Sequence, residues 1–316
     1  MKAAVIDRYG PPEVVELRDV EEPRPTAKQI LVRVESATVD SADARIRGAR
    51  FPRGFALGAR LAFGVRRPRR PILGTAFAGT VVEVGSAATG VRVGDRVAGM
   101  SGFRLGCHAE LVAVPATKVA PVPDAVSAAD AAGVLFGGTT ALHFLRACRV
   151  VPGRPGHAPR VLVVGGAGAV GVQAIQLARA SGATVRATAG PGRAALLAEL
   201  GAEHLDHSRD ELFDGSRYDA VLDTVGLLDA RSARRLLTDD GHAALIAADL
   251  PQTLRARGRV HTGTASERAE DVAHLLELLA DRTVRVVGDR LGFDEIVEAH
   301  RRVDSGHKTG SLVLTW

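Results

Sequence analysis

The feature that most constrains the fold is a short apolar stretch that runs directly into closely spaced glycines. Residues 160–171 read R-V-L-V-V-G-G-A-G-A-V-G. The apolar start is typical of a buried strand, and the residues after the glycines are typical of a helix. Gly166 permits the tight turn, Gly168 lets backbone approach a pyrophosphate, and Gly171 lets the helix pack close to the strand. The stretch therefore predicts a strand–turn–helix unit that binds a dinucleotide at the start of its helix.

The sequence around this unit alternates between short apolar segments and longer helical ones. Such alternation is typical of strands that pair in parallel, with connecting helices on both faces of the sheet. It predicts an α/β fold with a doubly wound sheet of the Rossmann type. The predicted strands are Val161–Val164, Thr184–Thr188, Ala220–Asp223 and Ala243–Ala247, and the predicted helices are Ala128–Val134, Thr140–Cys148, Val170–Ser181, Arg193–Leu200 and Ala230–Leu237.

The two ends of the chain differ from this middle part. Residues 1–122 hold apolar stretches punctuated by proline and glycine, which predicts a mostly β region. We therefore divide the chain into residues 1–122, 123–266 and 267–316. The predicted elements of the two ends include strands Ala3–Ile6, Ile30–Val34, Thr80–Val84 and Ser311–Trp316, and helices Ala269–Leu279 and Asp294–Arg302.

Composition narrows the environment and the partners. The sequence holds no apolar run near the roughly 20 residues that a membrane-spanning helix needs. Its start lacks a secretory pattern, so we expect a cytoplasmic protein with no membrane partner. Two cysteines, Cys107 and Cys148, are too few for a structural zinc site, and we expect both to be reduced. The net charge is +5, but only 4% of the residues are aromatic, so we expect no nucleic-acid partner.

The end of the next predicted strand separates NAD from NADP. An NAD site places an acidic residue about 20 residues after the glycines, where it accepts hydrogen bonds from the ribose hydroxyls. No acidic residue lies between Gly171 and Glu199. Arg193, within this stretch, carries a planar guanidinium that suits a 2′-phosphate, although a solvated arginine is the alternative. The sequence therefore predicts NADP(H) as the cofactor.

These features and several dispersed motifs give the chain a resemblance to a known family. It resembles zinc-independent members of the medium-chain dehydrogenase/reductase superfamily, in the NADPH:quinone oxidoreductase-like group, over nearly its whole length. The motifs are G-P-P-E-V at 10–14, V-D-S-A-D at 39–43, G-T-A-F-A-G at 74–79, V-G-D-R-V at 93–97, A-E-L-V at 109–112, G-T-T-A at 138–141, the glycine loop, L-G-A at 200–202, Y-D-A-V-L-D-T-V-G at 218–226 and K-T-G-S-L-V at 308–313. The resemblance implies a β-rich, GroES-like catalytic domain that the C-terminal segment completes, with the Rossmann domain inserted into it.

The resemblance also indicates where this sequence departs from the superfamily. Zinc alcohol dehydrogenases carry cysteine where Asp40 stands and His-Glu where Thr75 and Ala76 stand, so we expect no metal. Asp40 also replaces the usual asparagine of the quinone oxidoreductase-like group, and His207 stands where a tyrosine is common. The predicted cofactor-binding residues are Thr140, Gly166, Ala167, Gly168, Ala169, Val170, Gly171, Gly190, Arg193, His207, Val225 and Ala247.

Hydride transfer without a metal needs an electrophile that conjugation activates, such as a quinone or an α,β-unsaturated carbonyl. We expect a small apolar substrate of this kind, a homodimer, and roles for Asp40, His108 and Thr75 as proton donors or carbonyl anchors. Alternatively, Asp40 caps a turn and Thr75 satisfies backbone groups, while His143, a further candidate, packs in a core. Two other functions stay open. One is an alcohol or ketone oxidoreductase, including an enzyme recruited to an unusual biosynthetic step, and the other is a non-catalytic NADPH-binding protein.

The segment Phe51–Pro71 is longer and more apolar than a simple connection requires. Its apolar side chains alternate with arginines, and the spacing of Leu57 and Leu61 permits an amphipathic helix that glycines and prolines keep short. Surface packing, a substrate lid, a partner surface and a membrane-surface helix are the alternatives. We favour packing combined with a lid, in which Phe55, Leu57, Leu61 and Phe63 meet an apolar ligand.

Overall fold

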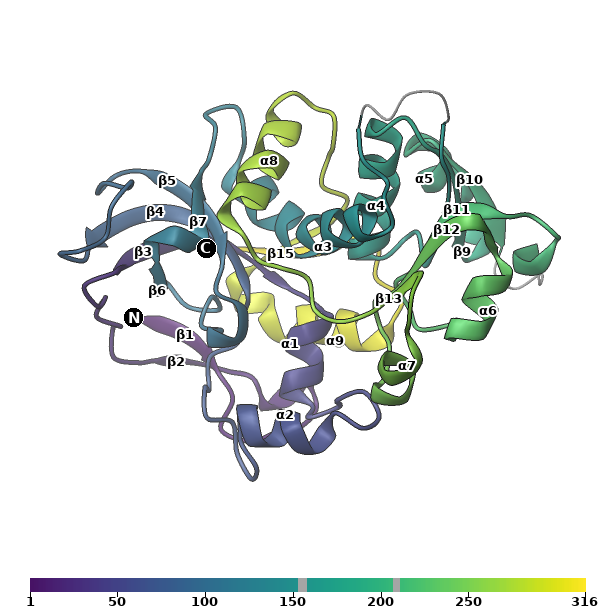
Figure 1. The fold of residues 1–316 in the computed structure, drawn as a ribbon. Coiled ribbons are helices and arrows are strands. Elements are labelled where there is room, and N and C mark those ends of the chain that lie inside the picture. The colour runs from purple at the N-terminus through teal and green to yellow at the C-terminus, as the bar shows by residue number, and fades with distance from the viewer. Residues whose placement is uncertain (153–157, 207–210) are drawn as a thin grey trace. The chain divides into compact units, whose positions relative to one another are not determined.

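A computed structural model of the chain describes residues 1–152, 158–206 and 211–316 (Figure 1). These residues form two compact units. Unit 1 consists of Met1–Phe51, Ala56–Phe136 and Glu267–Trp316, and unit 2 of Pro52–Phe55 and Gly137–Ser266. Within the described ranges, no helix is both long enough and apolar enough to cross a membrane.

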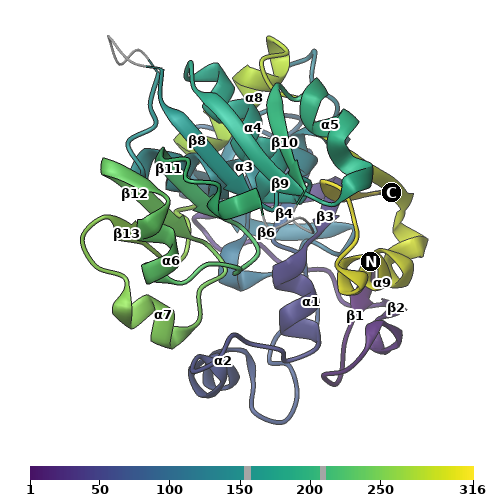
Figure 2. The same cartoon turned by 90° about the vertical axis from the view of Figure 1, so that its right-hand side faces the viewer.

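Unit 2 is built on a six-stranded parallel sheet with the order β10-β9-β8-β11-β12-β13 (Figure 2). The chain starts at the central strand β8, moves outward to β10 and then crosses over to β11. The strand order therefore reverses between β8 and β11, which is where sheets of this kind bind ligands. The strands are β8 (Arg160–Val164), β9 (Thr184–Ala189), β10 (Ala202–Asp206), β11 (Tyr218–Asp223), β12 (Leu237–Leu245) and β13 (Val260–His261).

The helices of unit 2 follow the strands in alternation, which confirms the predicted α/β fold class. They are α4 (Ala169–Ala180), α5 (Ala194–Glu199), α6 (Ala230–Arg235) and α7 (Leu250–Arg255). The last four residues of β8, Val161 to Val164, are all buried. A strand with a helix layer on each face reads as a continuous apolar run. That is why the sequence predicts β8 so clearly.

Helix α3 (Ala128–Ala147) corrects the prediction of two separate helices in this region. The gap between the two predicted helices contains Gly137 and Gly138, and the helix continues through them. A Cβ atom on Gly137 would lie 2.1 Å from the backbone oxygen of Ala169. The glycine therefore allows the backbones of α3 and α4 to approach closely, and it does not end the helix. The boundary between the two units falls inside α3.

Unit 1 contains a seven-stranded sheet in which β3 is the most connected strand. It pairs antiparallel with β15, β4 and β6. The pairing with β15 brings the end of the chain back into the sheet that the N-terminal part begins. The strands are β3 (Gln29–Val39), β4 (Ala76–Val84), β5 (Arg96–Met100), β6 (Leu111–Pro115), β7 (Val119–Pro121), β14 (Gly288–Gly292) and β15 (Ser311–Thr315), with β1 (Lys2–Val5) and β2 (Glu16–Asp19) as a separate pair.

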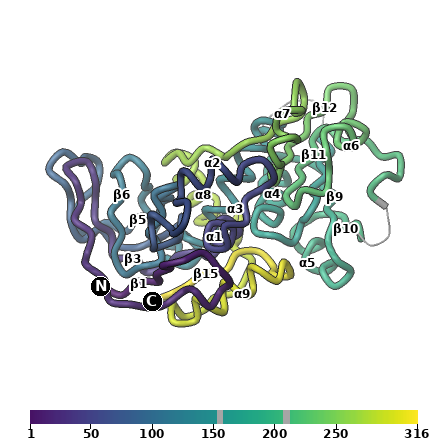
Figure 3. Tube along the Cα trace, turned by 90° about the horizontal axis from the view of Figure 1, so that it is seen from below, coloured from purple at the N-terminus to yellow at the C-terminus, as the bar shows by residue number. Residues whose placement is uncertain are grey.

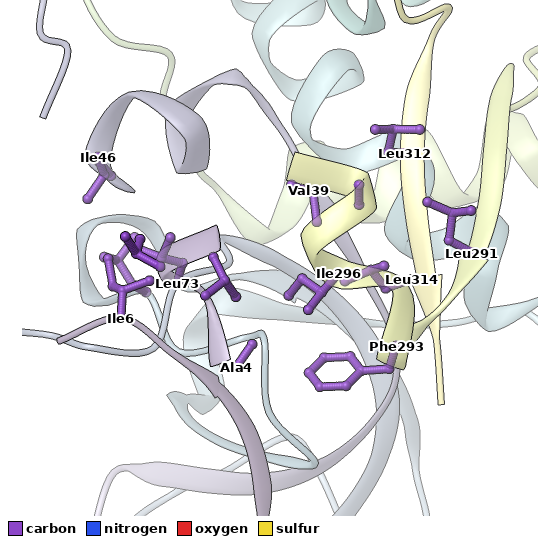
Figure 4. Close-up of a cluster of buried hydrophobic side chains, with 14 residues drawn as sticks. Ala4, Ile6, Val39, Ile46, Leu73, Leu291, Phe293, Ile296, Leu312 and Leu314 are labelled. Carbon is purple, nitrogen blue, oxygen red and sulfur yellow. The ribbon is translucent and has the colours of Figure 1, made fainter. Parts of the chain in front are cut away.

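Besides the first part of α3, four helices of the described residues accompany this sheet. They are α1 (Ser41–Arg47), α2 (Ala56–Phe63), α8 (Ala269–Ala280) and α9 (Ile296–Ser305). Only the first two of them lie before residue 122, in the region that the sequence predicted to be mostly β, and the last two were predicted. Helix α1 contacts α9 (Figure 3). A buried apolar cluster joins elements from both ends of the chain, with Ala4, Val39, Ile296 and Leu314 among its members (Figure 4).

Candidate functional site

The glycine loop of unit 2 forms the predicted strand–turn–helix unit, with one change in the role of its glycines. The left-handed conformation that makes the turn falls on Gly165, at φ 87°, and not on Gly166. A Cβ atom on Gly166 would lie 2.8 Å from the Cβ atom of Ala187 in β9. Gly166 is therefore required for close packing against the neighbouring strand, and Gly165 for the turn.

No N-cap side chain bonds to the backbone N–H groups at the start of α4. Gly168 is the N-cap residue and makes no side-chain hydrogen bond to the helix. A Cβ atom on Gly171 would lie 2.2 Å from the oxygen of Gly165, so this position requires glycine. The N–H groups of the first helical turn have no partner within the helix. The loop from Gly166 through Ala167, Ala169 and Val170 therefore fits a phosphate group at the positive end of the helix dipole.

Strand β9 holds the loop in place. The Oγ1 atom of Thr188 accepts a hydrogen bond from the N–H of Gly165 at 3.0 Å, and its backbone oxygen accepts one from Gly166 at 2.8 Å. The strand ends at Ala189, and Gly190 then leads into a short turn in which the N–H of Arg193 donates to Gly190 at 3.0 Å. Thr188 lay in a predicted strand, but its contact with the loop depends on strand pairing that the sequence does not show.

A second edge of the predicted cofactor site follows β11. The buried carboxylate of Asp223 accepts hydrogen bonds from the N–H groups of Val225, Gly226 and Leu228 at 3.0, 2.8 and 2.6 Å. Val225, which lies on this loop, is 61% exposed. Ala247 follows β12, and a Cβ atom on Gly226 would lie 3.5 Å from its Cβ atom. The sequence indicates Asp223 only as part of a family motif, and it does not predict that the carboxylate shapes this loop.

The predicted cofactor-binding residues of unit 2 thus gather after the carboxyl ends of four parallel strands. Gly166 to Gly171 follow β8, Gly190 and Arg193 follow β9, and Val225 and Ala247 follow β11 and β12. Thr140 lies on α3 almost one turn after Gly137, the residue that touches α4. His207 lies outside the described residues.

A second group of candidate residues lies in unit 1, around the start of α1. Asp40 is the N-cap of α1, and its Oδ1 atom accepts hydrogen bonds from the N–H groups of Ala42 and Asp43 at 2.8 and 3.4 Å. The hydroxyl of Thr75 donates to the Oδ2 atom of Asp40 at 3.2 Å. The side chain of Asp43 in turn accepts from the N–H of Asp40 at 3.0 Å. Both aspartates are buried.

His108 also belongs to this group of buried residues, because its ring lies close to Asp43. Its Nε2 atom lies 2.8 Å from the backbone oxygen of Thr38, which places the ring proton on Nε2, and 4.0 Å from Oδ2 of Asp43. The ring of His300 on α9 lies edge-on to it, with centroids 6.0 Å apart. Within the described ranges, Nδ1 of His108 and both ring nitrogens of His300 have no hydrogen-bond partner. Asp40, Thr75 and His108 therefore share one buried polar cluster, which Asp43 and His300 complete.

Burial sets the protonation of this cluster. It raises the pKa of Asp40, and the negative charge of Asp43 raises that pKa further. Burial also raises the pKa of Asp43. The same loss of water lowers the pKa of His108 and of His300. The cluster therefore favours a protonated carboxyl group beside neutral imidazoles.

Comparisons with known proteins agree with this arrangement. Residues 26–124 match the model of the alcohol dehydrogenase GroES-like domain, and residues 200–314 match that of zinc-binding dehydrogenase. A quinone oxidoreductase of Pseudomonas aeruginosa is 30% identical over 334 aligned positions, which cover 97% of each protein. The structure of a quinone oxidoreductase from Coxiella burnetii matches all of this chain and 99% of its own, with a TM-score of 0.86 and 29% identity. A phthioceranic/hydroxyphthioceranic acid synthase of Mycobacterium tuberculosis is 36% identical over 225 residues, which cover 68% of this chain and 10% of that protein.

The chain belongs to the medium-chain dehydrogenase/reductase superfamily. Its place is in the quinone oxidoreductase-like group, which confirms the resemblance. It is therefore an oxidoreductase that binds a nicotinamide dinucleotide.

The donor set does not fit the catalytic zinc that other members of this superfamily bind. At the positions of the zinc ligands, Thr75 Oγ1 bonds to Asp40 and Ala76 has no donor atom. The nearby thiol of Cys107 is directed to the Ser101 hydroxyl at 3.3 Å. Across the described parts of the chain, no three His, Cys, Asp or Glu side chains are grouped so that they could hold a metal ion.

The segment Phe51–Pro71 forms the short helix α2 but packs less than expected. The ring of Phe63 stacks on that of Phe51, with centroids 5.9 Å apart. The ring of Phe103 also lies 5.9 Å from that of Phe63 and is tilted against it. Leu57 and Leu61 are 75% and 56% exposed. The packing prediction is therefore wrong for these two leucines, and the lid stays a prediction.

Proposed function

We propose that this protein transfers hydride from NADPH to a quinone or an α,β-unsaturated carbonyl, without zinc. The proposal rests mainly on the residue types at the end of β9, the strand that pairs with β8 beside the glycine loop. This end offers Gly190 and Arg193 and no carboxylate. A carboxylate there would bind the ribose hydroxyls of NAD, whereas a guanidinium suits the 2′-phosphate of NADP.

The residues of unit 2 define how NADPH would be held. The N–H groups at the start of α4 receive the pyrophosphate, and the guanidinium of Arg193 receives the 2′-phosphate. The exposed side chain of Val225 and the adjacent Ala247 offer an apolar surface to the rest of the cofactor. When bound, NADPH supplies the hydride.

The residues of unit 1 define what happens to the substrate. Hydride addition to the β-carbon of an enone, or to a quinone ring, leaves a negative charge on the carbonyl oxygen, and a proton must follow. Burial raises the pKa of the Asp40 carboxyl group, which favours the protonated form that can supply this proton. The hydroxyl of Thr75, at 3.2 Å, orients the carboxyl group. The residues of this cluster do not fit the zinc ion that polarises the carbonyl in zinc-dependent members of the superfamily, so conjugation in the substrate would activate the carbonyl here.

Following NADPH absorbance with a panel of quinones, enones, saturated ketones and alcohols tests the proposal. We expect turnover with the first two classes only. If saturated ketones were reduced with a similar kcat/KM, the protein would instead be a ketone oxidoreductase. NADPH binding without turnover of any substrate would make the protein a non-catalytic NADPH binder. We also propose a homodimer, which light scattering of the purified protein tests.

A further inference from the structure

One segment of unit 1 carries a net positive charge as large as that of the whole chain. Residues 56–71 contain five arginines and no acidic residue. The net charge of the whole chain is +5, so the rest of the sequence is balanced. Charge gathered in this way attracts an anionic partner to one place on the molecule.

The same segment exposes apolar side chains. Helix α2 has no buried residue, and Leu57 and Leu61 are one turn apart and therefore lie on one side of it. They are 75% and 56% exposed, and Val65 after the helix is 56% exposed. The helix sequence A-L-G-A-R-L-A-F offers no polar side chain except Arg60.

The inner side of the segment is fixed on unit 1. The hydroxyl of Tyr9 donates to the backbone oxygen of Gly64 at 2.7 Å. The guanidinium of Arg60 lies 4.8 Å from the centre of the Tyr9 ring and donates to the oxygen of Val65 at 2.8 Å. Arg60 and Tyr9 are thus used in holding the segment, whereas the two leucines are not.

The remaining four arginines point their charge to solvent. Arg66, Arg67, Arg69 and Arg70 are exposed. Within the parts of the chain that the structure describes, none of them forms an ion pair with a carboxylate. Arg70 donates to the backbone oxygen of Arg104 at 2.8 Å. In Figures 1 and 2, α2 lies beyond α1, away from the sheet of unit 1.

We propose that residues 56–71 dock the protein on the surface of a lipid bilayer that contains anionic lipids. Leu57, Leu61 and Val65 enter the boundary between headgroups and acyl chains, and the four arginines contact lipid phosphates. A bilayer accounts for both features, because it accepts aliphatic side chains that bring no hydrogen-bonding group of their own and it carries phosphate beside them. This departs from the expectation of no membrane partner, which rested on the absence of a spanning helix and on the glycines and prolines that keep a helix short here. It also departs from the predicted lid, in which Leu57 and Leu61 meet an apolar ligand. The proposal is independent of the oxidoreductase activity.

Vesicle sedimentation tests the docking. The full chain is mixed with vesicles of phosphatidylcholine alone, or of equal parts of phosphatidylcholine and phosphatidylglycerol. We expect binding to the mixed vesicles, weaker binding at high salt, and little binding to phosphatidylcholine alone. No binding of the unmodified protein to the mixed vesicles would overturn the proposal. Binding to an acidic polypeptide in its place would indicate a protein partner.

Two variants and their matched controls separate the contributions. Replacing the four arginines by glutamine, or Leu57 and Leu61 by serine, should each lower the affinity for mixed vesicles at least about tenfold. The leucine control is Leu254→Ser, at a site 67% exposed on α7. The arginine control replaces four exposed arginines elsewhere, Arg24, Arg33, Arg92 and Arg255, and so removes the same net charge.

The controls should keep the affinity, and melting temperatures should show that all four proteins are folded. Equal losses in the arginine variant and its control would mean that net charge, and not this segment, drives binding. An unchanged affinity in the leucine variant would mean that no side chain enters the bilayer. Either result overturns the proposal.

Discussion

Replacing Arg193 by alanine tests which cofactor the end of β9 accepts. We expect the unmodified protein to bind NADPH more tightly than NADH, because Arg193 follows a strand end without a carboxylate. The loss of a charge-assisted contact with the 2′-phosphate costs about 1.5–3 kcal/mol, or about ten- to a hundredfold in affinity for NADPH. Titration of both cofactors against both proteins measures the gap.

The variant Arg255→Ala, on the exposed side of α7, is the control and should leave the gap unchanged. A preference for NADH in the unmodified protein would refute the assignment of NADP(H).

Asp40→Asn tests the buried carboxyl group through the pH dependence of stability. Because burial raises the pKa of Asp40, the folded chain holds this proton at pH values where the unfolded chain has lost it. Stability is therefore lost as the pH rises above about 4, the ordinary range of an aspartate, towards the raised pKa. Asparagine has no proton to lose. We expect the melting temperature of Asp40→Asn, relative to the parent, to rise between about pH 5 and about pH 8.

Asp229→Asn is the matched control, because Asp229 is the N-cap of α6 but is exposed, and its backbone hydrogen bonds lower its pKa. Asp229 is ionised in both states of the chain over this pH range. The difference between this variant and the parent should stay constant across it. A constant difference for Asp40→Asn as well would mean that its carboxyl is ionised in the folded protein.

For single residues, the sequence indicates which side chains are candidates for the site better than it indicates which of them are in contact in the fold. Asp40 and Thr75 are distant in sequence and stood out only as departures from a family pattern, yet they share a hydrogen bond. Asp43 carried a visible signal, since an acidic residue three positions after an N-cap is typical of a capping box. His300 carried none, because its role depends on burial against His108 by a helix from the far end of the chain.

Among the elements, the glycine loop is the most sensitive to a single added carbon. Gly171→Ala would place a Cβ atom 2.2 Å from the oxygen of Gly165, so the loop and α4 must separate. Such overpacking costs about 1–3 kcal/mol of stability, and the displaced loop should bind NADPH at least about tenfold more weakly. Chemical unfolding and cofactor titration measure the two effects.

Gly58→Ala is the control for the added methyl group, because a Cβ atom at this position in α2 meets no atom within 4 Å. Alanine should stabilise that helix by up to about 1 kcal/mol and leave NADPH affinity unchanged. Tight NADPH binding by Gly171→Ala would show that the loop does not hold the cofactor.

Two of the strands that the sequence did not predict depend on a neighbouring strand for their formation. Strands β10 and β14 were not predicted, because A-E-H-L-D and G-D-R-L-G lack an apolar pattern. Each pairs in parallel with one predicted strand, β9 or β15, and the pairing fixes its conformation. Strand β8 was predicted from its sequence alone, because it is buried on both faces and therefore reads as a continuous run of apolar residues.

On the scale of the whole molecule, each compact unit holds one set of the proposed functional residues. The cofactor-binding residues lie in unit 2, and Asp40, Thr75 and His108 lie in unit 1. The order of the motifs along the chain predicted a division into such parts, with its first boundary at residue 122 and its second at residue 266. The relation of Phe51–Pro71 to the rest was not visible, because an alternation of arginine and apolar residues fits both a packed face and an exposed one.

The last prediction concerns the whole purified protein, which should contain no stoichiometric zinc. Zinc is held by thiolates, imidazoles and carboxylates, usually four in a structural site and three in a catalytic one. Burial raises the pKa of both thiols, Cys107 and Cys148, to about 12, so neither is a thiolate near neutral pH. Burial favours the protonated form of Asp40, and Thr75 and Ala76 stand at the other ligand positions. Elemental analysis should therefore find far less than one zinc per chain.

Chelators should change neither the melting temperature nor NADPH consumption. Added zinc should not raise the melting temperature, because only a ligand that binds the folded state would do so. One tightly held zinc per chain, whose removal lowers the melting temperature or the activity, would contradict both this prediction and the proposed metal-free hydride transfer.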